Sequence, residues 1–185
     1  IFKGLVLNDL IINDRPNAVL NVKEIRCSFP IIPLLSKRVI VSRLILESPE
    51  IFIERRSDYS VNLAELFSQE SMANAEFKML VRQIVIRKAT VNFHDLTLGE
   101  LFTKELKALD ADIYFQLPAK IKYDLKFDIS SDLPIKVGIH GEYLAAAKEL
   151  TAEIKLKDFA PKDFERYYEY TGASFPSGRF DSLIR

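Results

Sequence analysis

His94 and Asp95 form the only dipeptide in the chain whose residue types suggest hydrolytic chemistry. A metal phosphohydrolase of the His-Asp type needs further histidine and aspartate ligands, and His140 is the only other histidine. We therefore interpret the pair as the end of a strand followed by a turn-forming aspartate. The sequence contains no glycine-rich phosphate loop, no dinucleotide fingerprint and no Cys/His metal spacing. No serine or cysteine has a histidine base in a recognisable motif.

Three further residues carry groups that can react in other proteins. Asp110 and Asp112 alternate with apolar residues along one predicted strand, which indicates a solvated polar face rather than an acid-base pair. Cys27 is the only cysteine, so it cannot form an internal disulfide. Its place in a strand-like run favours a buried, unreactive thiol. We expect neither enzymatic activity nor a metal or cofactor.

The charges of the chain are balanced, with 26 basic and 26 acidic side chains among 185 residues. This balance gives no electrostatic basis for binding nucleic acid. Hydrophobic residues make up 48%, which is enough for a core. No apolar run approaches the roughly 20 residues of a membrane-spanning helix, and no signal peptide is recognisable. The chain starts inside a strand-like stretch and stops inside another at residues 180–185. Both ends therefore look cut, which leaves open whether an anchor or signal lies upstream.

Two copies of one pattern organise the sequence, residues 39–66 and residues 83–99. The first copy has a strand, a break at Ser48-Pro49, a second strand, a polar turn and a helix start. A weaker third copy occupies residues 4–13. Self-similarity at a spacing of about 40 residues is typical of a repeat architecture. Superposition of the two main copies aligns Leu44 with Ile84, Leu46 with Ile86, Pro49 with Ala89, Ile51 with Val91 and Ile53 with Phe93.

Alternation of apolar and polar residues predicts antiparallel strands through most of the chain. Residues 5–13 form a strand pair or one bent strand, with a break at Asn8-Asp9. Residues 98–109 fit either a helix face or a strand, and the repeat favours the strand. The other predicted strands are residues 18–29, 109–117, 121–129, 135–143 and 150–156.

Two short helices are predicted beside these strands. Asn62 is a suitable N-cap, and Glu65 completes a capping box for a helix over residues 63–68. Residues 69–76 are polar and form a predicted linker. The second helix, residues 161–171, begins with a proline at its first position and is followed by a glycine that suits its C-terminal cap.

An aromatic face distinguishes the second predicted helix. Phe164, Tyr167 and Tyr168 are spaced three and four residues apart, and Phe159 precedes the helix at the position that packs against Phe164 in a hydrophobic staple. Such a face more often packs in a core than binds a ligand, so we expect it to pack against the sheet.

Short motifs of the first copy resemble the N-terminal region of AsmA-like proteins. They are the turn Pro33-Leu34-Leu35-Ser36-Lys37, a strand, Glu47-Ser48-Pro49, a second strand and a helix start at Asn62-Leu63. Residues 89–95 resemble the family's second unit, in which a strand ends at an aspartate. Residues 159–180 resemble the segment that joins successive units. The chain departs from the family at Lys37 and Asp58, where glycine is common.

This resemblance implies a fold that is mainly β, a curved, elongated antiparallel sheet (a β-taco or groove) with two short helices. It also implies that residues 1–185 are a single AsmA-like segment of a longer protein in the repeating β-groove superfamily, which includes AsmA and TamB. The expected parts are a first unit with a capping helix at 1–68, a linker at 69–76, a second unit with a β-meander at 77–157, a helix at 158–172 and the start of a further unit at 173–185.

Proteins of this family are anchored in the inner membrane of diderm bacteria and extend into the periplasm. The resemblance therefore implies a periplasmic, non-enzymatic module that binds or transfers lipid and supports phospholipid transport toward the outer membrane. Its partners would be phospholipid or another acyl lipid, the membrane and envelope proteins. The alternative is a structural scaffold for outer-membrane protein biogenesis with a closed core. Such a scaffold would dock other proteins on its sheet edges and on residues 30–35.

The regular apolar face of the later strands must be either covered or used for binding. The residues alone leave a closed core and an open trough as alternatives, and the resemblance favours the trough. Each lipid methylene buried there would contribute about 0.8 kcal/mol. The residues predicted to line it are Ile113, Phe115, Ile121, Tyr123, Leu125, Phe127, Ile129, Ile135, Val137 and Ile139.

Overall fold

The computed structural model describes residues 2–14, 17–30, 38–62, 78–99, 101–116, 120–175 and 177–185. These residues form a ten-stranded, mostly antiparallel sheet and a separate pair of strands, which confirms the mainly β prediction. The strands are β1 (Phe2–Asp14), β2 (Asn17–Pro30), β3 (Arg38–Val41), β4 (Arg43–Glu47), β5 (Glu50–Arg55), β6 (Lys78–Val81), β7 (Gln83–Asp95), β8 (Phe102–Gln116), β9 (Lys120–Ile129), β10 (Ile135–Leu144), β11 (Glu149–Phe159) and β12 (Phe180–Ile184).

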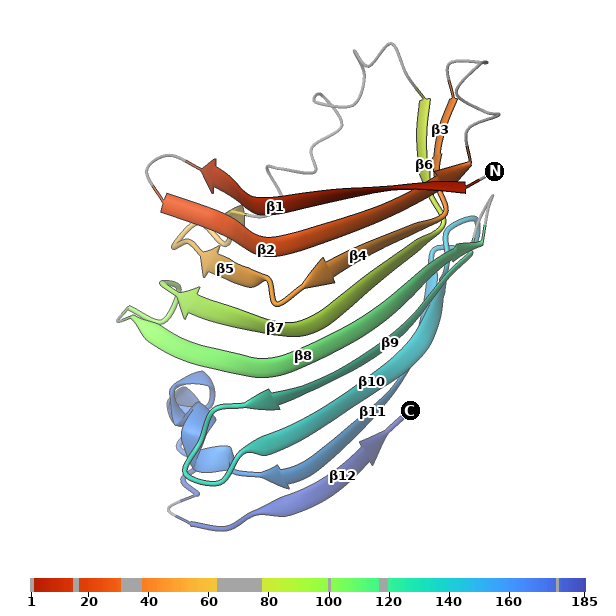
Figure 1. The fold of residues 1–185 in the computed structure, drawn as a ribbon. Helices are drawn as coiled ribbons and strands as arrows, with labels where there is room; N and C mark the ends of the chain where they lie inside the picture. The colour runs from red at the N-terminus through yellow and green to blue at the C-terminus, as the bar shows by residue number, and fades with distance from the viewer. Residues whose placement is uncertain are drawn as a thin grey trace.

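The large sheet follows chain order, β1-β2-β4-β7-β8-β9-β10-β11-β12 (Figure 1). Strand β5 continues the line of β4 and also lies between β2 and β7. The small sheet pairs β3 with β6. Residues 98–109, which fitted a helix or a strand, form a turn and then the first half of β8.

The two copies of the sequence repeat lie side by side and in parallel. Leu44 pairs with Ile84 and Ile51 with Val91, so the register follows the same offset of 40 as the superposition. Strands β3 and β6 keep that offset. The sheet is therefore mostly antiparallel, with parallel pairing between the two copies. Residues 56–77 separate β5 from β6 in the sequence, which is long enough for the crossover connection that a parallel pair requires.

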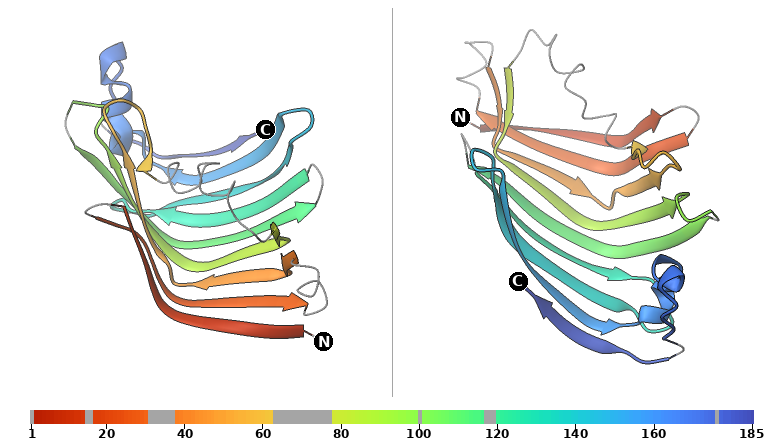
Figure 2. Two further views of the ribbon diagram at one scale, coloured as in Figure 1. Left: turned by 90° about the horizontal axis from the view of Figure 1, so that it is seen from above. Right: turned by 180° about the vertical axis from the view of Figure 1, so that it is seen from behind.

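A crease runs across the sheet where individual residues adopt a left-handed backbone. Asp9 in β1, Ser48 between β4 and β5, Lys88 in β7 and Ala108 in β8 have φ values of 53, 48, 52 and 51°. Figure 2 shows the strands bending there, so that the sheet folds toward one side. Each such residue shifts the in-out alternation of its strand by one position. The predicted breaks at Asn8-Asp9 and Ser48-Pro49 coincide with this crease.

Neighbouring carboxylates bind backbone amides that the bulges leave free. The Lys88 amide donates to Asp110 Oδ1 over 2.9 Å. In β11, Asp158 also has a positive φ of 58°, and its amide donates to Asp181 Oδ1 over 2.9 Å. Because an unpaired backbone amide is costly, these two aspartates stabilise the bends.

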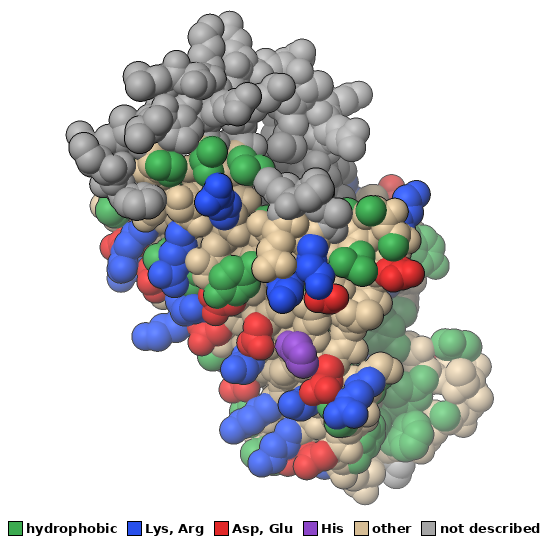
Figure 3. All heavy atoms as spheres, turned by 90° about the vertical axis from the view of Figure 1, so that its right-hand side faces the viewer, with side chains coloured by type: hydrophobic (Ala, Val, Ile, Leu, Met, Phe, Trp, Pro, Cys, Tyr) green, Lys and Arg blue, Asp and Glu red, His purple; other side chains and the backbone are tan. Residues whose placement is uncertain are grey.

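The sheet has an apolar inner face, toward which it bends, and a charged outer face. Cross-strand partners share a face. One inner row joins Ile84, Ile113 and Tyr123, whereas the adjacent outer row joins Asp112, Asp124 and His140. Figure 3 shows charged side chains over the left of the molecule and hydrophobic side chains toward the right, on the inner side.

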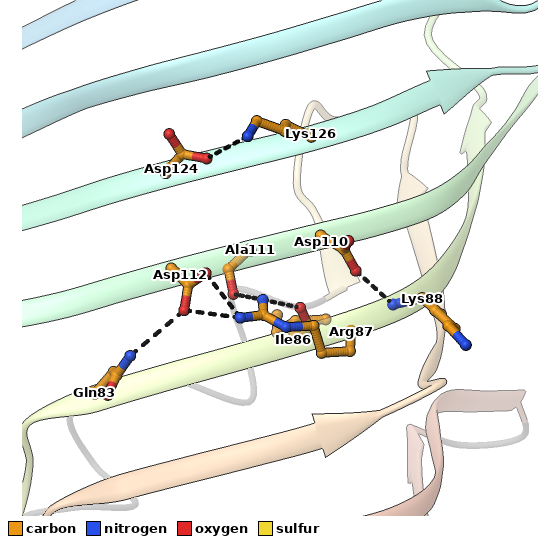
Figure 4. Close-up of polar contacts among 9 residues, drawn as sticks. All are labelled: Gln83, Ile86, Arg87, Lys88, Asp110, Ala111, Asp112, Asp124 and Lys126. Atoms are coloured by element: carbon orange, nitrogen blue, oxygen red, sulfur yellow. Dashed lines mark hydrogen bonds and ion pairs between the residues drawn. The ribbon is translucent and has the colours of Figure 1, made fainter.

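Ion pairs on the outer face bind adjacent strands together. Arg87 donates to both carboxylate oxygens of Asp112, at 3.2 and 2.9 Å (Figure 4). A further pair lies within one strand, β9, where Lys126 is 3.8 Å from Asp124. The placement of Asp110 and Asp112 on this face agrees with their interpretation as polar surface residues.

The predicted helix over residues 161–171 forms, but as two 3-10 segments, η2 (Pro161–Tyr167) and η3 (Glu169–Thr171). A single regular helix was therefore wrong, because Phe164 departs from helical geometry with φ −123°. Residues three apart lie above one another in a 3-10 turn, so Phe164 and Tyr167 both face the sheet. Pro161 begins the segment and Gly172 ends it with φ 73°, as predicted.

The first predicted helix and the linker at 69–76 lie outside the described residues, as does most of the segment 30–35. Asn62, its predicted N-cap, lies at the edge of β5. Its side chain accepts from the Glu54 amide at 3.0 Å and donates to the Phe52 carbonyl at 2.8 Å. The carboxamide thereby pairs with backbone groups of β5 much as another strand would. No helix in the described ranges is long and apolar enough to cross a membrane.

Candidate functional site

All ten residues of the predicted trough share the inner face of β8, β9 and β10. The register of antiparallel partners brings them together across three strands. The cross-strand pairs are Phe115 with Ile121, Ile113 with Tyr123, Leu125 with Ile139, Phe127 with Val137, and Ile129 with Ile135.

Burial divides these ten residues into two groups. Ile135 and Val137 are 0 and 7% exposed and form an apolar cluster with Ala160, on which Phe164 packs. The other eight are half-buried. Phe127 contacts this cluster and a second one around the crease, formed by Ala89, Val91 and Leu109. The predicted trough is thus a closed core at one end and a partly accessible surface at the other.

Ile139 also packs against the Ile135–Val137 cluster. We call the accessible part the open arm, defined by Ile113, Ile121 and Leu125. Figures 1 and 2 show no described strand or helix over this part of the inner face, whereas η2 lies over the opposite end. A single layer with half-buried aliphatic side chains presents an apolar surface that can take up an apolar ligand.

Tyr123 and Gly141 shape the inner face next to the open arm. They are cross-strand partners, and the Tyr123 hydroxyl donates to the Thr151 carbonyl over 2.9 Å. A methyl group on Gly141 would lie 2.0 Å from the Thr151 carbonyl oxygen and 2.7 Å from the Tyr123 hydroxyl oxygen. Only glycine therefore allows this close approach of strand, ring and neighbouring carbonyl.

We call residues 160–172 the cap, because they cover the closed end. The ring of Phe164 stacks on Phe159 with centroids 5.2 Å apart, and Tyr167 meets Phe102 edge to face at 5.0 Å. Lys104 Nζ lies 5.3 Å from the centre of the Phe164 ring. The predicted packing of Phe159 against Phe164 is confirmed. In the described structure, the cap contacts the sheet through side chains, while the backbone hydrogen bonds of the cap are local.

A buried carboxylate fastens the cap to the sheet. Asp95 is 0% exposed and accepts from the Thr97 amide and hydroxyl at 2.8 and 2.6 Å. It also accepts from the Tyr167 hydroxyl at 2.7 Å and lies 3.4 Å from Arg55 Nη1. These contacts connect the ends of β5 and β7 with the cap.

The surroundings shift the pKa values of both Asp95 and Tyr167. Burial by itself raises the pKa of Asp95, but the hydrogen bonds from Thr97 and Tyr167 and the charge of Arg55 together hold that pKa below its ordinary value. Burial, followed by the hydrogen bond to Asp95 and its negative charge, raises the pKa of the Tyr167 hydroxyl. The carboxylate therefore stays ionised and the phenol protonated at neutral pH.

Sequence reasoning assigned Asp95 to a turn and did not find its partners. The turn contact to Thr97 agrees with that interpretation. The repeat in the sequence could have identified Arg55 as a partner of Asp95. The two residues occupy equivalent positions in the two copies and are register partners in the structure. Opposite charges at one repeat position, at the ends of two adjacent parallel strands, indicate a pair.

The remaining chemistry-bearing residues do not converge on a site in the described structure. His94 pairs with Thr103 across β7 and β8, and His140 lies exposed on the outer row of β10. Burial raises the pKa of the half-buried Cys27 thiol, which lowers its reactivity. Among described residues, no group of three or more His, Cys, Asp and Glu side chains is arranged to hold a metal ion.

The sequence matches no protein-family model, and no curated protein matches it significantly.

Proposed function

We propose that this chain binds the acyl chains of phospholipids along the open arm, as a non-enzymatic lipid-binding and lipid-transfer module. The observation that carries the proposal is the continuous row of half-buried aliphatic and aromatic side chains on one face of β8, β9 and β10. Water contact with such a surface is unfavourable, and an acyl chain would replace it at a gain of about 0.8 kcal/mol per buried methylene.

The chemistry of the open arm favours weak selectivity among lipids. Its defining residues are aliphatic. Two tyrosines lie beside them on the inner face: Tyr123, whose hydroxyl already donates to Thr151, and Tyr143, the register partner of Ile121. Recognition would therefore depend on apolar area rather than on directed polar contacts. Such a surface suits a carrier that receives and releases many lipid species.

The resemblance to AsmA-like proteins supplies the cellular part of the proposal. In that setting the module would be periplasmic, connected to the inner membrane of a diderm bacterium, and would pass phospholipid toward the outer membrane. Cell fractionation of the natural full-length protein tests this part separately. Recovery with the inner membrane and digestion by protease in the periplasm are the expected results, and cytosolic recovery would contradict them.

Photocrosslinking tests the lipid contact directly. A photoreactive amino acid at Leu125 or Ile113 faces the inner side, whereas the same group at Asp124 or Asp112 faces the outer side of the same strands. With vesicles of phosphatidylethanolamine and phosphatidylglycerol, we expect lipid adducts from the inner positions alone. Equal labelling of both faces would rule out a directed trough.

A substitution test separates trough from core. Leu125→Asp should preserve cooperative unfolding and abolish co-purified phospholipid in organic extracts, while Lys126→Asp on the exposed outer face should change neither. Phe127 is unsuitable for this test because it contacts both apolar clusters. If Leu125→Asp unfolds the chain and the wild type carries no lipid, the closed-core scaffold becomes the better explanation.

A further inference from the structure

The edge of the sheet at β1 is long, unpaired and apolar on both faces. In the described structure, β1 pairs with β2 alone. Leu5 and Leu7 are 48 and 45% exposed on the inner side, and Val6 and Ile11 are 54 and 56% exposed on the outer side. An edge with free backbone groups and exposed apolar side chains is suited to pairing with another strand.

Strand β1 is complementary to itself. The left-handed Asp9 shifts the alternation, so Leu5, Leu7, Leu10 and Ile12 all have inner-face partners in β2. An antiparallel pair of two β1 strands with its two-fold axis between Asn8 and Asp9 therefore matches the faces. Its register pairs Leu5 with Ile12, Val6 with Ile11, Leu7 with Leu10, and Asn8 with Asp9 of the other copy.

The bend and the charges fit the same arrangement. In each copy the sheet has two halves that meet at the crease. A two-fold axis that passes through the crease and bisects the bend places the first half of each copy beside the second half of the other copy. The crease therefore continues across the junction. The two Asp9 residues do not lie directly opposite each other, which avoids facing like charges.

We propose that a second copy of this chain pairs with the β1 edge, in the antiparallel register centred between Asn8 and Asp9. Such a dimer would double the ten-stranded sheet and join the two inner faces into one surface. Pairing of single strands buries a small area, so the dimer is expected to be weak and in the micromolar range. The proposal does not depend on lipid binding.

Sedimentation equilibrium of the whole chain, from about 1 to 200 μM around the expected affinity, tests the dimer. Val6→Lys places a charge in the middle of the interface and should raise the dissociation constant at least about tenfold, or 1.4 kcal/mol. Ile11→Lys should act alike, because each residue faces the other. Leu183→Lys, at a residue that is 49% exposed on β12, is the matched control and should leave dimerisation unchanged.

Two results of this experiment would overturn the proposal. One is a monomer at every concentration. The other is a dimer that Leu183→Lys weakens as much as Val6→Lys, because that would place the contact at β12. Circular dichroism and urea unfolding should be the same in all four proteins, which separates loss of pairing from loss of fold.

Crosslinking tests the register. In a Cys27→Ser background, V6C/I11C should form a covalent dimer on mild oxidation, and V6C alone should not. A covalent dimer from V6C alone, or none from V6C/I11C, would contradict this register.

Discussion

The two ends of the inner face of β9 and β10 have the same residue pattern and different surroundings. At the closed end, Ile135 is 0% exposed beneath the cap, and at the open arm Ile121 is half-buried. Both are β-branched aliphatic residues on one face of adjacent strands. The difference is therefore caused by the cap, which packs over one end alone among the described elements.

This comparison shows how one sheet combines stability with an accessible apolar surface. The clusters at the crease and under the cap bury enough apolar area to hold the strands together. The open arm then needs only cross-strand side-chain contacts and the backbone hydrogen bonds between neighbouring strands to stay folded. A bent single-layer sheet can leave part of its inner face uncovered because its core is formed elsewhere, at the crease and under the cap.

Truncation of one isoleucine at each end gives the largest expected contrast. Ile135→Ala should lower the free energy of unfolding by about 4 kcal/mol, since it leaves a cavity beneath the cap. Ile121→Ala should lower it by about 1 kcal/mol, because part of that side chain already contacts water. Urea unfolding measures both values, and equal losses would show that the open arm is covered as well.

Adding a methyl group tests the tight packing beside the open arm. Gly141→Ala should cost about 3 kcal/mol, because the new carbon would collide with the Thr151 carbonyl on the adjacent strand. Gly138→Ala, on the same strand, meets its nearest atom at 3.9 Å and serves as the control. Thermal unfolding should separate the two variants, and similar transition temperatures would contradict the close approach.

Removing the charge that fastens the cap should have an effect of about 2 kcal/mol. Asp95→Asn keeps the shape and loses the ionic acceptor for Tyr167 and Arg55. The folded pKa of Asp95 is lowered, so its stabilising contribution is present above the unfolded value of about 3.9 and disappears as pH falls below it. The difference between wild type and variant should be constant from pH 7 to pH 5 and shrink in more acidic buffer.

The smallest expected effect is that of a single hydroxyl. Tyr167→Phe removes one hydrogen bond to Asp95 and keeps the ring against Phe102, so it should cost about 1 kcal/mol. Hydrogen exchange should report faster exchange in residues 160–172 and unchanged protection in β8. Uniformly faster exchange would mean that the cap is not a separate element.

Much of the architecture was predictable from alternation and turn residues. The meander of β9, β10 and β11, the breaks at Asn8-Asp9 and Ser48-Pro49, and the cap residues Pro161 and Gly172 follow from local rules. Local rules could not predict the parallel pairing of the repeats, because alternation defines a face and not a strand direction. Local rules also predicted a regular helix, whereas the structure has two 3-10 segments in which Phe164 departs from helical geometry.

The sequence by itself determined which residues share the apolar face, because side chains alternate along a strand and the ten predicted trough residues keep that period. Only the tertiary structure decided which of them are buried. Val137 and Ile121 have equivalent patterns, but the chain returns after β11 and places Phe164 over the end that contains Val137. It also brought Arg55, Asp95 and Tyr167 together from three distant segments, a contact that depends on strand register and the path of the cap.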